Sequence, residues 1–208
     1  RVAFAEYYLI KIESSENKQH PWSGKPTKEA ERIFASTYPA VHAWFETYRA
    51  ALVKRYDQGK YFWELRSCKY WKDFENPKII YPDIAQRAEF VLDTTGYYPG
   101  NTIYFIPSSQ KWFLGLLNSA GVYWFYTRIS SQLLGGAVRF FSQYVSQIPI
   151  PAATPQQQAA IAQVVERILA AKQADAAADV AALEAEIDGL VYWLYGLTAA
   201  EVGVIENG

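Results

Sequence analysis

The sequence contains one cysteine, two histidines and no methionine. Cys68 alone cannot form a disulfide within the chain, and with His20 and His42 it cannot complete a Cys/His zinc site, so we expect no bound metal. The scarcity of thiols is typical of a reducing compartment and indicates a cytoplasmic location. The same residues provide no set of nucleophile, base and orienting group, so we expect a chain without catalysis of its own.

Targeting and membrane-spanning segments are also missing from the sequence. It begins at Arg1 without a basic and apolar leader, so we expect a fragment excised from a longer protein. The longest uncharged run, residues 112–127, is too short to span a membrane and is interrupted by glycines and polar residues. A buried helix or helix pair is expected there, and no membrane partner.

Charge is distributed unevenly along the chain. Residues 1–150 contain 18 lysines and arginines against 13 acidic residues, whereas residues 151–208 contain 2 against 8. A mildly basic body is compatible with binding a polyanion but does not require it. The 7 Trp, 16 Tyr and 11 Phe residues are expected mainly in a core, for which 208 residues are long enough.

The centre of the sequence predicts three short strands joined by polar turns. They are the β-rich runs Lys78–Tyr81, Phe90–Leu92 and Thr102–Ile106. Between the first two lies a compact segment, Asp83–Glu89, which we call the recognition loop. Its Gln86, Arg87 and Glu89 can together pair with any base edge in the major groove of DNA, so this loop is the first candidate for function.

The segment before these strands is less regular. Residues 5–12 alternate as in a strand, and residues 14–27 have the composition of a polar loop. A long helix is expected to begin at Pro39 and to run to Tyr56, with apolar residues at helical spacing. The basic side chains of this helix are better explained by a solvent-exposed face near the helix C-terminus than by contact with phosphates. In Lys69–Phe74, cations interleave with aromatic side chains, which suits a surface that follows phosphates.

Two helices are expected after the last strand, over Gln110–Leu117 and Val122–Tyr126. Asn118 and Ser119, between them, are explained by helix capping and need no catalytic role. Gly135-Gly136 predicts a tight turn, which either serves the fold alone or brings the backbone close to a partner.

The C-terminal segment begins after an extended boundary at Ile148–Pro151. Thr154–Gln157 has the pattern of a capping box and opens one helix. A second helix, residues 180–194, has a coiled-coil spacing of apolar residues over two heptads. The two are expected to form an antiparallel hairpin that bends near Asp175. Its acidic face favours packing on protein, with dimerisation through these helices left open.

Several motifs resemble those of one known family, in the same order. They are PKIIYPDI, RAEFVLD, GYYPGNTIYFI, LGLLNSAGVYWFY, GGAVRFF, IPIP and the ending LYGLT. From Tyr38 to the C-terminus, the chain resembles the TaqI-like C-terminal specificity domain of adenine-specific DNA methyltransferases and type IIG restriction-modification enzymes. The residues alone predict an α+β domain. With the resemblance, we expect a strand and linker at 1–37, a small mixed-sheet target recognition domain with flanking helices at 38–151, and an antiparallel helical hairpin at 152–208.

The resemblance implies double-stranded DNA as the partner, and it directs residues to two roles. Gln86, Arg87 and Glu89 are expected to read base edges, with Arg preferring guanine, Gln adenine and Glu cytosine. Cations are expected to position the DNA backbone: Lys69, Lys72, Lys78, Lys111, Arg128 and Arg139.

The catalytic motifs of the resembled class are missing from the sequence. A glycine-rich loop for S-adenosylmethionine and an Asn-Pro-Pro-Tyr-type motif both fail to occur. We therefore expect no cofactor in this chain, and S-adenosylmethionine in the N-terminal methyltransferase domain of the parent, which is the second expected partner. A fused endonuclease in the parent stays open. A nuclease site in this chain is disfavoured because the lysine expected after Glu89 is Val91.

Two other classes of function remain as alternatives. One is a protein assembly module that uses the helical hairpin and does not bind DNA. The other is a carbohydrate-binding module with exposed tryptophans, which the long C-terminal helices disfavour.

Overall fold

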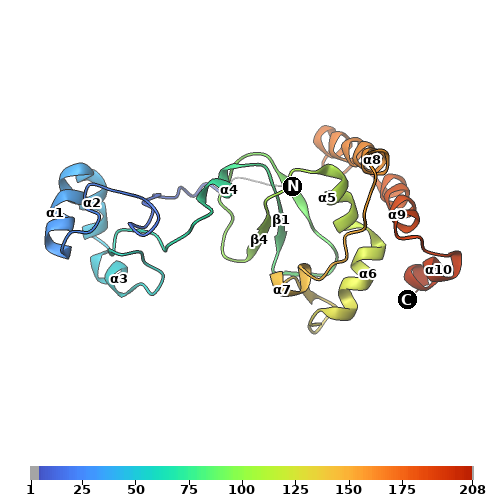
Figure 1. Ribbon diagram of the computed structural model, residues 1–208, viewed down its shortest axis with the longest axis horizontal. Coiled ribbons are helices and arrows are strands. Elements are labelled where there is room, and N and C mark those ends of the chain that lie inside the picture. The colour runs from blue at the N-terminus through green and yellow to red at the C-terminus, as the bar shows by residue number, and fades with distance from the viewer. Residues whose placement is uncertain (1–4, 208) are drawn as a thin grey trace. The chain divides into compact units, whose positions relative to one another are not determined.

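The computed structural model describes residues 5–207, which form two compact units, each with its own hydrophobic core. The N-terminal unit comprises residues 5–72, and the C-terminal unit comprises residues 73–207 (Figure 1). The predicted α+β class is confirmed, since helices and small sheets both occur. The compact units part at residue 73, whereas the functional boundaries after residues 37 and 151 stay a prediction.

The N-terminal unit is built around stacked aromatic rings. Its helices are α1 (Thr27–Thr37), α2 (Pro39–Glu46) and α3 (Arg49–Lys54), and α4 (Trp71–Glu75) begins at its end. Trp63 lies between the parallel rings of Phe34 and Tyr61, at 5.0 and 4.8 Å between ring centroids. The buried carboxylate of Glu64 accepts a hydrogen bond from Trp22 Nε1 (2.8 Å). These rings and this buried acceptor explain why so many aromatic residues occur in a short segment.

Two expectations for the N-terminal unit are wrong. Residues 5–12 form no strand, because no described strand pairs with them. The single helix expected from Pro39 is interrupted at Thr47 and continues as α3 to Lys54. The hydroxyl and the N–H of Thr47 both bond to the Trp44 carbonyl oxygen (2.6 and 3.2 Å) and tighten the last turn of α2. Helix α1, which buries Ala30, has no counterpart among the expected elements.

The C-terminal unit contains a three-stranded sheet in the order β3-β1-β4. Its strands are β1 (Lys78–Pro82), β3 (Val91–Asp93) and β4 (Ile103–Ile106). Ile79 pairs with Leu92 on one side and with Ile106 on the other, and both pairings are antiparallel. The three expected strands are confirmed, but the described sheets are antiparallel rather than mixed.

Helices make up most of the chain between this sheet and the C-terminus. They are α5 (Lys111–Asn118), α6 (Ala120–Ile129), α7 (Ser142–Val145), α8 (Pro155–Ala174), α9 (Ala181–Tyr195) and α10 (Ala199–Asn207). Helices α5 and α8 approach closely at Gly115, where a Cβ atom would lie 2.8 Å from Ile161 Cγ2 and 2.9 Å from Val165 Cγ2. Only glycine leaves room for this approach.

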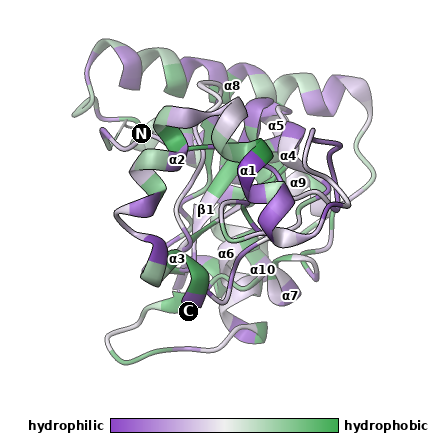
Figure 2. Ribbon diagram, turned by 90° about the vertical axis from the view of Figure 1, so that its left-hand side faces the viewer, coloured by the Kyte–Doolittle hydropathy of each residue, from purple (hydrophilic) through white to green (hydrophobic). Residues whose placement is uncertain are grey.

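The C-terminal helices belong to the core of their unit. The capping box is confirmed, since Thr154 N donates to Gln157 Oε1 (2.7 Å) and the Thr154 hydroxyl accepts in return. Arg167 on α8 pairs with Glu186 on α9 at 2.8 Å. Ile187, one of the apolar residues with coiled-coil spacing in the second helix, is buried in the unit's own core. Hydrophobic and hydrophilic residues alternate along α8 (Figure 2). In the described part of the chain, no helix is long and apolar enough to cross a membrane.

Candidate nucleic-acid interface

The recognition loop is fixed where it leaves β1. The N–H of Asp83 donates to Thr102 O (2.9 Å), and the Asp83 carbonyl oxygen accepts from Phe140 N (2.7 Å). Its carboxylate lies 3.3 Å from Arg139 Nη1 in a partly exposed ion pair. The backbone at this end of the loop is therefore held by the residue before β4 on one side and by the residue after β5 on the other.

A second loop is joined to the recognition loop by a two-stranded sheet. Strand β2 (Ile84–Ala85), within the recognition loop, pairs antiparallel with β5 (Val138–Arg139). Strand β5 ends the glycine hairpin, which we define as residues 131–139 and which turns at Gly135 and Gly136 with φ of +84° and +78°. Such angles favour glycine, so the expected tight turn is confirmed. The two loops form one continuous structure.

Helix α6 supports both loops through two tyrosines. The hydroxyl of Tyr123 donates to Gln86 O (2.8 Å), and that of Tyr126 donates to Arg139 O (2.6 Å). Burial raises the pKa of each tyrosine above its ordinary value, so both hydroxyls remain protonated donors at neutral pH. One helix thus ties the recognition loop to the glycine hairpin.

Asn118 fixes the far end of the recognition loop. Its Oδ1 accepts from Phe90 N (3.1 Å) and its Nδ2 donates to Phe90 O (2.9 Å), which is the pairing that a neighbouring strand would provide. The expected helix cap is performed by Ser119, whose hydroxyl accepts from Val122 N (3.4 Å). Sequence reasoning missed the role of Asn118, because the residue it holds is distant along the chain.

The three candidate base-reading residues lie together on the exposed side of this framework. The side chain of Arg87 is 81% exposed and lies 3.4 Å from the Glu89 carboxylate, which is 46% exposed. Gln86 is also exposed, and its Nε2 lies 3.4 Å from Gly135 O at the hairpin turn. The loop therefore presents donors and acceptors to solvent on a backbone that is anchored before and after them.

Two arginines flank the loops on the supporting elements. Arg139 pairs with Asp83 and lies 5.1 Å from the ring centre of Phe141. Arg128, in the last turn of α6, lies 3.7 Å over the ring of Trp124 and remains exposed. Ring contacts of this kind hold a guanidinium in place while its outer N–H groups stay accessible.

Lys78 must be withdrawn from the expected backbone-binding residues. It is fully buried, its Nζ lies 2.6 Å from Asp93 Oδ2, and it donates to Phe74 O (2.7 Å). Burial opposes ionisation of Asp93, but hydrogen bonds from Lys78 and Thr95 outweigh it and lower the pKa of that carboxyl. DNA cannot reach an ammonium group in this position, so Lys78 stabilises the sheet instead.

The other lysines are placed apart from the loops or in the other unit. Lys111 forms an ion pair with Glu166 on α8 at 2.6 Å. Helix α8 and the glycine hairpin, coloured orange and yellow, lie at opposite ends of the C-terminal unit (Figure 1), so Lys111 is not brought to the loops. Lys69 and Lys72 are exposed in the N-terminal unit.

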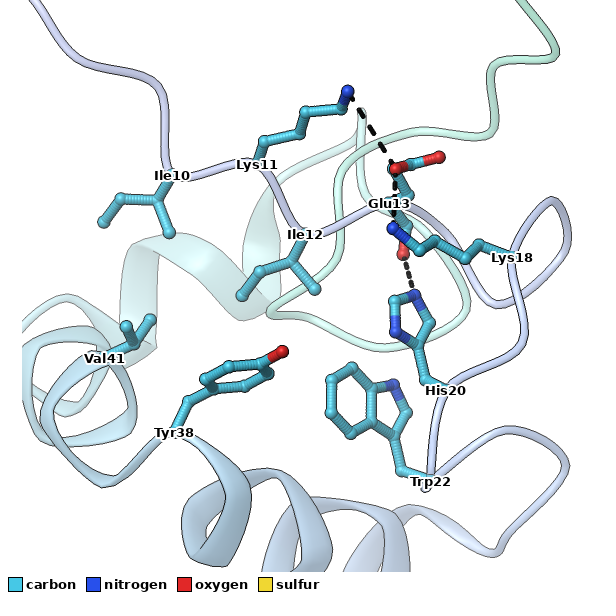
Figure 3. Close-up of a pocket in the computed structure, with 9 residues that line it drawn as sticks. All are labelled: Ile10, Lys11, Ile12, Glu13, Lys18, His20, Trp22, Tyr38 and Val41. Carbon is cyan, nitrogen blue, oxygen red and sulfur yellow. Dashed lines mark hydrogen bonds and ion pairs between the residues drawn. The ribbon is translucent and has the colours of Figure 1, made fainter. Parts of the chain in front are cut away.

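The N-terminal unit contains a small pocket lined by the residues labelled in Figure 3. Its charged groups engage one another, since Lys18 Nζ lies 3.0 Å from the Glu13 carboxylate and His20 Nε2 lies 2.8 Å from the Glu13 carbonyl oxygen. The His20 ring stacks on Trp22, which is fully buried. These contacts make the pocket wall an extension of the aromatic core.

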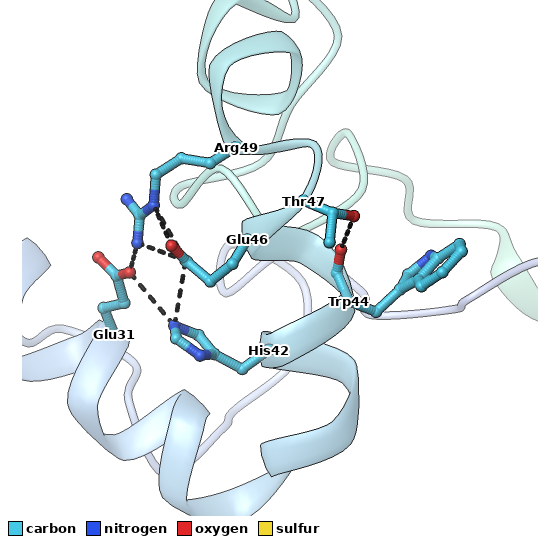
Figure 4. A network of polar contacts seen from close by, with 6 residues as sticks. All are labelled: Glu31, His42, Trp44, Glu46, Thr47 and Arg49. Atoms are coloured by element: carbon cyan, nitrogen blue, oxygen red, sulfur yellow. Dashed lines mark hydrogen bonds and ion pairs between the residues drawn. The ribbon is translucent and has the colours of Figure 1, made fainter.

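A polar network in the same unit has side chains of the types that bind metals (Figure 4). His42 Nε2 lies 3.3 Å from Glu31 and 3.4 Å from Glu46. The cation that these carboxylates face is Arg49, which lies 2.8 Å from Glu46 and also pairs with Glu31. The network therefore links α1, α2 and the start of α3 by compensated charges.

Comparison with known proteins gives a family match that includes both loops. The family model of the TaqI-like C-terminal specificity domain matches residues 5–150, which begins earlier than the expected Tyr38 and ends before the C-terminal helices. Type II methyltransferase M.PaeR7I of Pseudomonas aeruginosa is 33% identical over 79 residues, which is 36% of this chain and 14% of that protein. Type II methyltransferase M.BanIII of Aneurinibacillus aneurinilyticus is 26% identical over 133 residues, which is 57% of this chain and 22% of that protein. The matched segments span less than a quarter of either relative.

Proposed function

Because the chain belongs to the family of TaqI-like C-terminal specificity domains, we propose that it selects the double-stranded DNA sequence on which a type II methyltransferase acts. The observation that carries the proposal is the recognition loop, whose backbone is held at Asp83, Gln86 and Phe90 while Arg87 extends into solvent. A preorganised backbone with exposed hydrogen-bonding side chains reads base edges with little loss of conformational freedom on binding.

Each exposed side chain of the loop has a preferred base. Arg87 donates two parallel hydrogen bonds to guanine, Gln86 pairs with adenine, and Glu89 accepts from cytosine. Arg128 and Arg139 contact phosphates beside the loops, and Lys69 and Lys72 contact phosphates from the N-terminal unit. Lys111 joins them only by exchanging Glu166 for a phosphate.

The parent protein supplies the chemistry in this proposal. It is an adenine-specific DNA methyltransferase whose N-terminal domain binds S-adenosylmethionine. The glycine-rich loop for the cofactor and the Asn-Pro-Pro-Tyr-type motif are both missing from the sequence of the present chain, so they belong to that N-terminal domain. In this proposal, methylation and a cytoplasmic location are properties of the parent, and a fused endonuclease in the parent stays open. The described chain provides the choice of site and no catalytic group.

The test is selection of duplexes from a randomised DNA pool by the 208-residue chain at low salt, repeated at roughly three times the salt concentration. A short consensus that survives the higher salt supports sequence readout, because phosphate attraction weakens with salt whereas base contacts retain their preference. Weak binding without a consensus would overturn the proposal for this chain. A concentration-dependent dimer without DNA affinity would favour the protein assembly module instead.

A further inference from the structure

Leu134 is an apolar side chain that protrudes fully from the glycine hairpin. Its exposed fraction is 103%, and it directly precedes the two glycines of the turn. Its neighbour Leu133 is partly buried, so the hairpin has an apolar side chain available for packing and still leaves Leu134 in water. Folding of the described chain leaves the Leu134 side chain in water, so this side chain contributes no hydrophobic free energy to folding.

The backbone beneath Leu134 is held in a defined position. Leu133 N donates to Ala137 O (2.8 Å) across the turn, and Arg139 N donates to Ser131 O (3.1 Å) at its base. Val138 is buried in the core of the C-terminal unit. The hairpin therefore presents its tip at a fixed distance from the core.

The tip lies beside the side chains that we propose to read DNA. Gln86 Nε2 is 3.4 Å from the carbonyl oxygen of Gly135, and the β2–β5 pairing fixes the two loops in one register. A protein bound through this loop has DNA within reach of the hairpin. The interior of a base stack is apolar, and proteins insert leucine and similar side chains between base steps as wedges.

We propose that the glycine hairpin is a wedge, and that Leu134 inserts into the base stack of DNA held by the recognition loop. This inference rests on the proposed DNA-binding function. Unstacking lowers the cost of opening the adjacent base pair, so the wedge assists an enzyme that must extrude its target base. Three arginines lie near the hairpin, Arg87, Arg128 and Arg139. Arg87 and Arg139 are paired with acidic residues, but the exposed guanidinium of Arg128 lies over a ring, so the surface carries a positive charge that suits DNA better than an apolar protein face.

The test places 2-aminopurine at successive positions of the selected consensus duplex, because its fluorescence rises when the base loses its stacking neighbours. The wild-type 208-residue chain is expected to raise the fluorescence at one base step. Leu134→Ala is expected to lose this rise, and Leu134→Met, which keeps an apolar side chain of similar length, is expected to retain it. Val204→Ala removes another exposed apolar side chain, on α10 and outside the interface, and serves as the matched control.

The possible outcomes distinguish the wedge proposal from the proposed DNA recognition on which it rests. Recovery of a consensus together with loss of the fluorescence rise in Leu134→Ala supports the wedge. A consensus with no rise at any position, or an equal rise in the wild type and in Leu134→Ala, overturns the wedge and leaves DNA recognition standing. Failure to recover any consensus overturns both.

Discussion

The ion pair between Lys78 and Asp93 is closed off from solvent, which makes it sensitive to the loss of either partner. Lys78→Met leaves the Asp93 carboxylate buried without its counter-charge, and we expect it to lower the free energy of unfolding by about 3–5 kcal/mol. Lys72→Met, at an exposed lysine, is the matched control and should change it by no more than about 0.5 kcal/mol. Urea denaturation of both variants measures the difference. Equal losses would contradict a structural role for Lys78.

The same pair predicts how stability responds to acid. The pKa of Asp93 lies below its ordinary 3.8, so the folded state binds this proton more weakly than the unfolded chain does. The contribution of the pair is complete above pH 3.8 and is lost as the pH falls through the lower folded pKa. We expect Asp93→Asn to lose less stability than the wild type over this range. Parallel curves of unfolding free energy against pH for the two proteins would refute the assignment.

Arg87 offers the sharpest test of base reading. If it makes a bidentate contact with guanine, Arg87→Ala should weaken binding by about 1–3 kcal/mol and relax one position of the consensus. Competition binding of the consensus duplex against single-base variants measures both effects. Lys72→Ala is the control, since removal of a phosphate ligand weakens binding to all sequences alike. Uniform weakening in Arg87→Ala would reduce Arg87 to a phosphate ligand.

At the scale of secondary-structure elements, the contact between α5 and α8 depends on one missing side chain. Gly115→Ala introduces a Cβ within 3 Å of methyl groups on the buried residues Ile161 and Val165. We expect a loss of about 1–3 kcal/mol from overpacking, despite the better helix propensity of alanine. Thermal and urea denaturation measure it.

Gly189→Ala on α9 is the natural control for that substitution. A Cβ atom at Gly189 has no described neighbour within 4 Å, so the gain in helix propensity, about 1 kcal/mol, should appear undiminished. Opposite signs for the two glycines are the expected result. A stabilising Gly115→Ala would show that α5 and α8 can move apart to accommodate the Cβ atom at little cost in free energy.

Elements with a local signal could be predicted from the sequence, and elements that depend on distant partners could not. The strand at Ile79 and the cap at Thr154 follow from neighbouring residues. The β2–β5 pairing joins strands of two residues each, too short for any periodic pattern. The burial of Lys78 could have been predicted only from the pairing of β1 with β3, because the antiparallel register places Lys78 opposite the carboxylate of Asp93.

The candidate site followed the same division. The exposure of Arg87 and Glu89 was expected from a polar loop between strands, and the structure places them there. The anchoring of that loop by Asn118 and Tyr123 required knowledge of the packing of α6 against it, which no spacing in the sequence reveals. The roles of individual side chains toward DNA stay predictions.

At the scale of the whole molecule, the separate cores predict that the C-terminal unit folds alone. Residues 73–208 should unfold cooperatively and should select the same consensus, since Gln86, Arg87 and Glu89 all lie in this unit. Binding should be weaker and less dependent on salt, because Lys69 and Lys72 are removed. The slope of log K against log salt should become shallower by about 0.9 for each phosphate that the shortened chain no longer neutralises. A different consensus from the shortened chain would show that the N-terminal unit takes part in reading.

The antiparallel pairing between β2 and β5 constrains how the two loops can change during evolution. A recombination event that exchanges the segment around Ile84 alone brings in a strand whose residues no longer match their partners around Val138. Lineages that acquire a new target sequence should therefore acquire both segments together, or else change single side chains such as Arg87 while leaving the pairing untouched. An engineer who grafts a specificity from a relative faces the same choice.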